Sequence, residues 1–203
     1  MERIGQILPT LNIRWHGRGG FGAKTAALLL AEAVIEAGGH AQASPEFGPE
    51  RRGAPVQAYT RIAPQPIRRR GPVEDPDVVV VLDRRLLRVP EVVRGIRPST
   101  WVVVNAPRPV RVPEVPPEQM LAVDASGIAR RILGRDLPNM AMLAVVAVDL
   151  VGLPGEAFCR WLGERLRREF PEELAQANVR VAREAIEEGR KWRLVGRPLS
   201  AAL

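Results

Sequence analysis

Cysteine and histidine are almost absent from this chain. Its 203 residues include one cysteine, Cys159, and two histidines, His16 and His40. A disulfide needs two cysteines, and zinc sites and iron–sulfur clusters need up to four ligands. The shortage excludes an internal disulfide and a cluster held by this chain alone, and we expect no metal site. Cys159 is expected to be a core or partner-facing thiol.

Aromatic residues and long apolar runs are also scarce. Aromatic residues make up 4% of the sequence, so a stacking surface for bases or sugars is poorly supplied. The most apolar run, Met140–Val148, has nine residues, roughly half a membrane-spanning helix. The first ten residues contain no apolar signal-peptide core. We expect a cytoplasmic protein with neither a membrane nor a nucleic acid as partner.

Lysine is scarce as well. Lys24 and Lys191 are the two lysines among 30 basic residues, so arginine carries the net charge of +7. Arginine pairs bidentately with carboxylates and phosphates, which suits interfaces and phosphate sites. A GC-rich coding sequence would produce the same bias. The charge alone therefore does not indicate nucleic-acid binding.

The remaining composition is that of a globular protein. Apolar residues make up 46% and charged residues 26% of the chain, and the length suffices for a sizeable core. We expect a single domain over residues 1–203, with its core at about 11–189 and a C-terminal tail at 190–203.

Hydrophobic patterning predicts strands that alternate with helices. Valine runs at 78–81 and 102–104 are typical of parallel strands buried on both faces. In the last helix, Leu174, Val181 and Ala185 share one stripe. The pattern predicts an α/β fold: a three-layer Rossmann-like domain with a mostly parallel sheet and a helical C-terminal third. Strands are expected at 11–15, 40–44, 56–62, 77–83, 101–105 and 120–124. Helices are expected at 23–37, 84–87, 90–94, 128–133, 140–150, 155–169 and 171–189.

A glycine turn joins the first strand to the first helix and has the spacing G-x-G-x-x-G. Such glycines let the backbone approach an anion at a helix N-terminus, and flanking basic side chains add positive charge. The alternative is a tight turn that lets helix and sheet pack closely. The residues concerned are Gly17, Arg18, Gly19, Gly20, Gly22 and Lys24.

The same turn is a weak indication of a bound NAD or FAD. The dinucleotide fingerprint requires an acidic residue about twenty positions further on, at the end of the second strand. Here the segment Gln42–Pro45 contains none, and Glu46 comes slightly late.

A second polar constellation follows the expected second strand, in the segment Glu46–Pro55. Two carboxylates, two arginines and an aromatic residue lie close together in a Pro- and Gly-rich stretch. Loops placed by a rigid scaffold often carry function. The alternative is a surface ion pair without further role. The candidate residues are Glu50, Arg51, Arg52 and Gly53.

Asn139 is the third feature. It follows Pro138 at the start of an expected helix, where a side-chain amide can cap the helix N-terminus. Capping is its default interpretation.

Three motifs together resemble the γ subunit of the 2-oxoacid:ferredoxin oxidoreductases. They are Gly17–Gly22, Glu46–Val56 and Asn139–Leu143, in this order along the chain. The form Glu-Arg-Arg-Gly-Ala-Pro is similar to the pyruvate and ketoisovalerate types. The similarity extends from about Ile13 to the helix after Asn139 and, by length and pattern, into the final helices.

The resemblance implies a subunit of an enzyme that converts a 2-oxoacid and coenzyme A to an acyl-CoA, CO2 and reduced ferredoxin. It implies α and β subunits that hold thiamine diphosphate and Mg, and a δ subunit, often with β, that holds [4Fe–4S] clusters. This chain would be a Rossmann-like γ domain beside the active site, inactive alone and without catalytic residues of its own.

The resemblance also implies which residues face coenzyme A or the active site: the glycine-turn residues above with Lys24, Glu50–Gly53, and Asn139. Two alternatives remain open at this point. One is a stand-alone Rossmann-type dinucleotide-binding oxidoreductase, and the other is a non-catalytic scaffold subunit.

Overall fold

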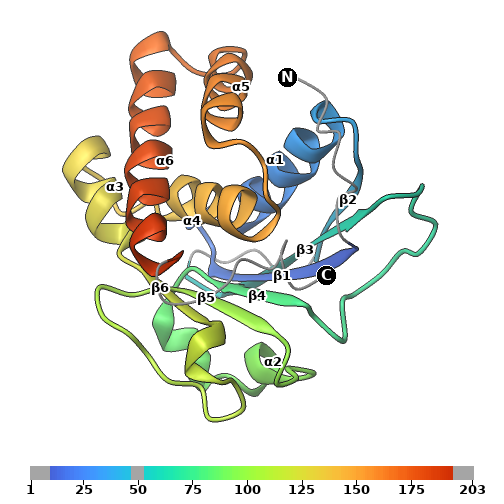
Figure 1. The fold of residues 1–203 in the computed structure, drawn as a ribbon. Coiled ribbons are helices and arrows are strands. Elements are labelled where there is room, and N and C mark those ends of the chain that lie inside the picture. Colours follow the sequence, from blue (N-terminus) through green and yellow to red (C-terminus); the bar gives the residue numbers. More distant parts are fainter. Residues whose placement is uncertain (1–9, 47–52, 194–203) are drawn as a thin grey trace.

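A six-stranded sheet forms the centre of the protein in a computed structural model that describes residues 10–46 and 53–193 (Figure 1). The strand order is β2-β3-β1-β4-β5-β6. Strands β1, β4, β5 and β6 are parallel, whereas β3 runs antiparallel to both β1 and β2. The strands are β1 Leu11–Arg18, β2 His40–Pro45, β3 Pro55–Ala63, β4 Val78–Val81, β5 Trp101–Asn105 and β6 Met120–Val123.

The valine-rich strands are buried on both faces, as their continuous apolar runs predict. All four residues of β4 are buried, and alternate side chains enter two separate cores. Val78 and Val80 face the helices, while Val79 and Val81 pack on the opposite side. This double burial places β4 and β5 in the middle of the parallel part of the sheet.

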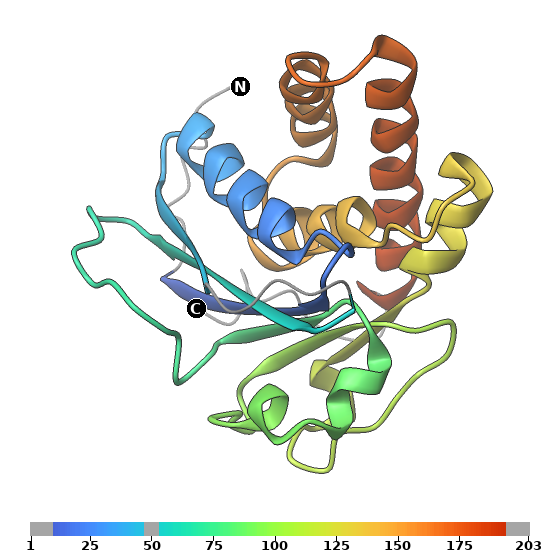
Figure 2. The ribbon, with the colours of Figure 1, turned by 180° about the vertical axis from the view of Figure 1, so that it is seen from behind.

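Most helices cover one face of the sheet (Figures 1 and 2). The central packing joins α4 to α6, and α1 contacts both β3 and α4. The core on this face is aliphatic, with Trp15 and Phe158 as its largest side chains. The helices are α1 Ala23–Glu36, α3 Ala125–Leu133, α4 Asn139–Val145 with a π-helical turn η3 Val146–Leu150, α5 Gly155–Arg167 and α6 Glu172–Arg193.

Short elements and a proline-rich connection cover part of the other face. They are η1 Arg84–Arg88, α2 Pro90–Val93 and η2 Pro117–Gln119. The irregular connection between β5 and η2 contributes buried Val112 and Val115 to this second core. The predicted three-layer α/β architecture with a mostly parallel sheet and a helical C-terminal third is confirmed.

Strand β3 separates β1 from β2, which the alternating pattern did not indicate. In a dinucleotide-binding fold, the strands that flank the first helix are parallel neighbours, and the acidic residue after the second strand reaches the ribose. Here β1 pairs with β3 and β4 instead. The start of this sheet therefore lacks the arrangement that the fingerprint assumes.

The last helix differs from its prediction in two ways. It continues to Arg193 rather than ending at Gly189, so the expected tail at 190–203 begins within α6, and residues 194–203 lie outside the described part. The predicted apolar stripe is wrong at Leu174, which is 41% exposed, because this first turn of α6 extends beyond the core that buries Val181 and Ala185. No helix among the described residues is long and apolar enough to cross a membrane.

Candidate functional site at the carboxyl edge of the sheet

The glycine turn combines close packing with an open helix N-terminus. Strand β1 continues through Gly17, where an added Cβ would lie 3.0 Å from the Cβ of Ala23, so glycine lets α1 begin against the strand. Gly20 and Gly22 have φ values of 95° and 74°, which favour glycine. Gly22 occupies the N-cap of α1, and no side chain caps this end. Both interpretations of the turn, packing and anion approach, are compatible with this geometry.

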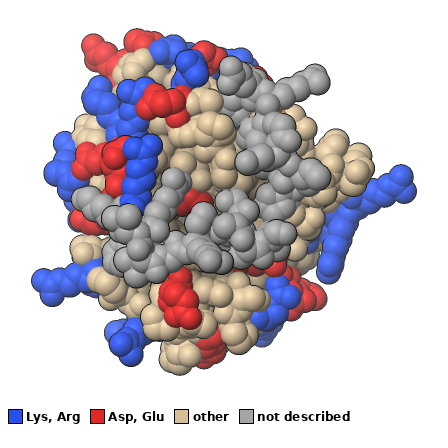
Figure 3. Space-filling view, in the orientation of Figure 1, with Lys and Arg blue, Asp and Glu red and all other residues tan. Residues whose placement is uncertain are grey.

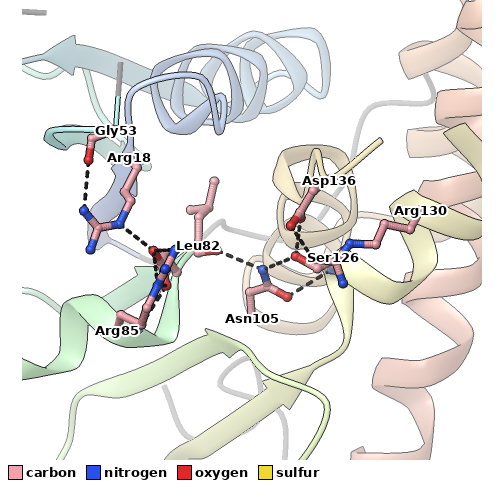
Figure 4. A network of polar contacts seen from close by, with 9 residues as sticks. Arg18, Gly53, Leu82, Arg85, Asn105, Ser126, Arg130 and Asp136 are labelled. Carbon is pink, nitrogen blue, oxygen red and sulfur yellow. Dashed lines mark hydrogen bonds and ion pairs between the residues drawn. The ribbon is translucent and has the colours of Figure 1, made fainter. Parts of the chain in front are cut away.

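The glycine turn is joined to the end of the second constellation by backbone hydrogen bonds. The N–H of Gly19 donates to the carbonyl of Ala54 over 2.9 Å, and the N–H of Gly53 donates to the carbonyl of Gly19 over 3.3 Å. Arg18 Nη1 also donates to the Gly53 carbonyl, over 2.9 Å (Figure 4). Two motifs more than 30 positions apart thus meet at the carboxyl end of β1.

The other end of that segment is held by Tyr59 on β3. Its hydroxyl donates to Glu46 Oε2 over 2.7 Å. Burial of the ring, followed by this hydrogen bond, raises the pKa of Tyr59, so the phenol keeps its proton. The candidates Glu50, Arg51 and Arg52 lie between these two anchored ends in sequence and outside the described residues.

Asn139, the first residue of α4, lies at the same site although it is more than 100 positions from the glycine turn in sequence. Its predicted role as a helix cap is wrong. Pro138 is the N-cap of α4, its backbone is already helical, and no side chain caps the helix. The Asn139 side chain instead lies against Gly22, where an added Cβ would come within 2.3 Å of its Nδ2. The packing of α4 on α1 brings these two residues together.

A buried carboxylate after β4 anchors Arg18. Asp83 Oδ2 accepts from Arg18 Nε over 2.6 Å and from Arg85 Nη2 over 2.8 Å (Figure 4). The Asp83 side chain is 6% exposed. Burial acts to raise the pKa of Asp83, but the hydrogen bonds from Arg85 and Arg18 outweigh it and lower the pKa. Asp83 is therefore ionised throughout the physiological range.

Polar side chains that follow β5 and β6 continue this edge. Asn105 Nδ2 donates to the Leu82 carbonyl and to Ser126 Oγ, over 2.8 Å each, and its Oδ1 accepts from the Ser126 N–H (Figure 4). Ser126 Oγ in turn donates to Asp136, which also accepts from Arg130. The network fixes the side chains at the carboxyl ends of three neighbouring strands.

These groups line a pocket of about 420 Å³ that extends from the glycine turn to α3. Its size falls within the range of small-molecule sites, and the carboxyl edge is where open α/β sheets bind ligands. Its described lining combines arginines with carboxylates and the Ser126 hydroxyl, so it is a strongly polar pocket. Its walls are formed by Phe21, Leu82, Asp83, Arg84, Arg85, Asn105, Pro107, Asp124, Ser126, Arg130 and Asp136.

Sequence reasoning missed Asp83, Asn105 and Ser126 as site residues. Each lies at or just after the end of a parallel strand, and such ends meet along one edge. Polar residues at or after the ends of apolar runs are visible in the sequence. Recognising that they lie close together requires the strand order, which the local pattern does not specify.

The remaining candidates lie in the interior or carry no metal-binding arrangement. Burial, and then the charge of Arg14, lower the pKa of His16 to about 3, so this imidazole is neutral. Burial raises the pKa of Cys159, which is 1% exposed in the helical core. Among the described residues, no three His, Cys, Asp or Glu side chains form a group that could hold a metal ion.

Sequence comparison identifies the family. A model of the pyruvate ferredoxin/flavodoxin oxidoreductase family matches residues 12–188. The chain belongs to this family. The resemblance drawn from the three motifs is confirmed. Among the described residues, the glycine turn, the Gly53–Ala54 end of the second motif and Asn139 lie together at one edge of the sheet.

Relatives support this assignment over nearly their full length. Pyruvate synthase subunit PorC of Methanothermobacter thermautotrophicus is 42% identical over 184 residues, which cover 91% of this chain and 98% of the relative. The common γ subunit of the pyruvate/ketoisovalerate oxidoreductases of Pyrococcus furiosus is 42% identical, covering 87% of this chain and 96% of the relative.

Solved structures share the fold. The crystal structure of pyruvate oxidoreductase subunit PORC from Thermotoga maritima has 37% identity and a TM-score of 0.72, covering 88% of this chain and 96% of that one. A 2-oxoglutarate:ferredoxin oxidoreductase from Magnetococcus marinus has 20% identity and a TM-score of 0.67. It matches 96% of this chain but 31% of its own length, so the same fold there forms part of a longer polypeptide.

Substitution of Gly22 tests the contact between the turn and Asn139. Gly22→Ala adds a Cβ both at positive φ and against the amide of Asn139, whereas Gly20→Ala at positive φ meets no atom within 4 Å. Backbone strain should lower the free energy of unfolding of both variants by about 1–3 kcal/mol. Overpacking against Asn139 should lower that of Gly22→Ala by about 1 kcal/mol more. Urea unfolding of both variants measures the difference, and Asn139→Ala should reduce it in the Gly22→Ala background. Equal losses at the two glycines would mean that Asn139 does not constrain the turn.

The ionised state of Asp83 makes its contribution to stability depend on pH. Its folded-state pKa lies below the ordinary 3.8, so the contribution is complete above that value and disappears as pH falls through the folded pKa. Asp83→Asn should lower the free energy of unfolding by about 1–3 kcal/mol at neutral pH, and this loss should shrink as pH falls below 3.8 through the folded-state pKa. Asp75→Asn, at an exposed carboxylate, is the control and should change it by less than about 0.5 kcal/mol. If Asp83→Asn lowered the free energy of unfolding by the same amount at every pH, the assignment of an ionised, paired carboxylate would be contradicted.

Proposed function

We propose that this chain is the γ subunit of a pyruvate-type 2-oxoacid:ferredoxin oxidoreductase and faces coenzyme A. The enzyme would oxidatively decarboxylate a 2-oxoacid with coenzyme A, giving an acyl-CoA, CO2 and reduced ferredoxin. The observation that carries the proposal is the meeting of the glycine turn, Gly53 and Asn139 at the carboxyl edge of the sheet. The relatives named above, which are subunits of such enzymes, support it.

The chemistry of this edge fits a phosphorylated ligand. Coenzyme A carries a pyrophosphate and a 3′-phosphate, which helix N-termini and arginines bind well. The N-terminus of α1 has no capping side chain and no acidic residue in its first turn, and Lys24 lies in that turn. Arg18, held by Asp83, fixes the neighbouring backbone. Arg51 and Arg52 directly precede Gly53 in sequence and would add two guanidinium groups for the phosphates.

The residues of this chain do not suit the other cofactors of such an enzyme. A [4Fe–4S] cluster needs four thiolates, and the chain has one cysteine, which is buried. We therefore assign the clusters to partner subunits. The family resemblance implies the δ subunit, often with β, for the clusters, and α and β for thiamine diphosphate and Mg. Ferredoxin would be reached through that complex, in the cytoplasm.

The position of β3 weakens the dinucleotide-binding alternative. The scaffold alternative predicts the same fold and the same relatives. It differs in one respect: a scaffold subunit would affect assembly but not the use of coenzyme A.

Arg51→Ala separates the two roles. In the assembled enzyme, each lost charge-assisted hydrogen bond to a phosphate should cost about 1.5–3 kcal/mol. This cost corresponds to a roughly 10- to 150-fold loss in kcat/KM for coenzyme A. The KM for the 2-oxoacid should remain unchanged, because its pocket belongs to other chains. Steady-state kinetics with each substrate varied in turn makes the comparison, and Arg52→Ala should behave similarly.

Arg180→Ala, at an exposed position on α6, is the matched control and should leave both KM values unchanged. Normal assembly with unchanged coenzyme A kinetics in both loop variants would assign this chain to a scaffold. Turnover of a 2-oxoacid by the chain expressed alone would refute the subunit assignment itself.

A further inference from the structure

The connection between β3 and β4 projects away from the body of the protein (Figures 1 and 2). We call residues 64–72 the basic arm. It contains Arg68, Arg69 and Arg70, all exposed, and prolines at 64, 66 and 72 that restrict its backbone. It contributes no residue to either hydrophobic core. Its conformation is therefore not explained by burial of its own side chains.

A buried arginine on β3 fixes the end of the basic arm. Arg61 is 5% exposed, and its Nη1 and Nη2 donate to the carbonyls of Gly71 and Pro72 over 2.9 and 2.8 Å. Burial lowers the pKa of Arg61, and the nearby charge of Arg69 lowers it further. A guanidinium is thus desolvated to hold two carbonyl groups of a surface loop.

A second buried arginine holds the residues that follow. Arg14 on β1 is 4% exposed and donates from Nη1 to the carbonyls of Val73 and Glu74. Its Nη2 donates to the carbonyls of Val92 and Arg94 at the end of α2. Desolvation of a charged group is costly, so two such arginines under one loop indicate that its position matters.

The arginines of the basic arm differ from other unpaired exposed arginines, such as Arg108, Arg135 and Arg180, because three of them are consecutive in sequence. Elsewhere in the described chain, exposed arginines such as Arg97, Arg130 and Arg183 pair with carboxylates. Arg68, Arg69 and Arg70 form no ion pair with any described residue. Figure 3 shows basic side chains standing out from the right-hand edge of the surface. The positive charge is concentrated, projecting and not neutralised within the described part of the chain.

We propose that the basic arm is a docking element for an acidic surface on another subunit of the enzyme. The proposal rests on the subunit assignment made above. Arginine is enriched at protein interfaces and pairs bidentately with carboxylates, and a preorganised element loses less entropy on binding. The basic arm contains no aromatic residue for stacking on bases, so a carboxylate-bearing protein surface is favoured over a nucleic acid.

Charge reversal of the basic arm tests this proposal. The variant R68E/R69E/R70E, its neutral counterpart R68Q/R69Q/R70Q and the wild-type chain are titrated against the co-expressed remaining subunits. The matched control is R108E/R135E/R180E, which makes the same change in net charge at exposed arginines without a described ion pair. Circular dichroism and thermal melting establish that all four proteins are folded.

The arm-reversal variant should raise the Kd for the remaining subunits at least tenfold, with a smaller increase for the neutral variant and less than twofold for the control. Added salt should weaken wild-type binding more than binding of the arm-reversal variant, because screening acts on the charges of the arm. Unchanged assembly of both arm variants would overturn the proposal and leave the subunit assignment intact. Loss of oligonucleotide binding with normal assembly would instead assign the arm to nucleic acid. Failure of the wild-type chain to assemble would remove the subunit assignment, and this proposal with it.

Discussion

Arg18 joins three parts of the chain at the carboxyl edge of the sheet. It ends β1, pairs with the buried Asp83 after β4, and donates to the carbonyl of Gly53 before β3. Asp83 is 6% exposed, and the hydrogen bonds from Arg85 and Arg18 keep it ionised. Removing the Asp83 carboxylate would therefore leave both arginines without this partner. The backbone hydrogen bonds between Gly19, Gly53 and Ala54 attach the same two segments, and the Arg18 side chain ties both of them to the end of β4. It is the constraint that brings separate motifs into one site.

The elements of the fold were largely predictable, because their signals are local. The valine runs of β4 and β5 identify strands buried on both faces, and the glycine turn marks the junction of β1 and α1. The insertion of β3 between β1 and β2 was not predictable in the same way. Strand order depends on long-range pairing, and an alternating strand such as Pro55–Ala63 has no local feature that specifies its neighbours. Leu174 shows the same limit on a helix, because its position on the apolar stripe does not reveal where the core ends.

The site was predictable in part, for a related reason. Glycines with an unusual backbone requirement are recognisable in sequence, and Gly20 and Gly22 do adopt positive φ. The role of Asn139 was not recognisable, because the contact that matters is with a residue more than 100 positions away. Asp83 and Asn105 become visible as site residues once their strands are known to be parallel neighbours. Local patterns indicate which residues need an unusual backbone conformation, whereas the tertiary fold determines which side chains contact one another.

We propose that coenzyme A meets this chain at the carboxyl edge of the sheet, beside Arg18. Hydrogen–deuterium exchange of the assembled enzyme, with and without coenzyme A, tests it most directly. Bound coenzyme A should slow exchange in peptides that cover residues 17–24 and 53–56, while the outer face of α6 remains unchanged. Slowed exchange confined to the other subunits, with no change in these two segments, would contradict the account.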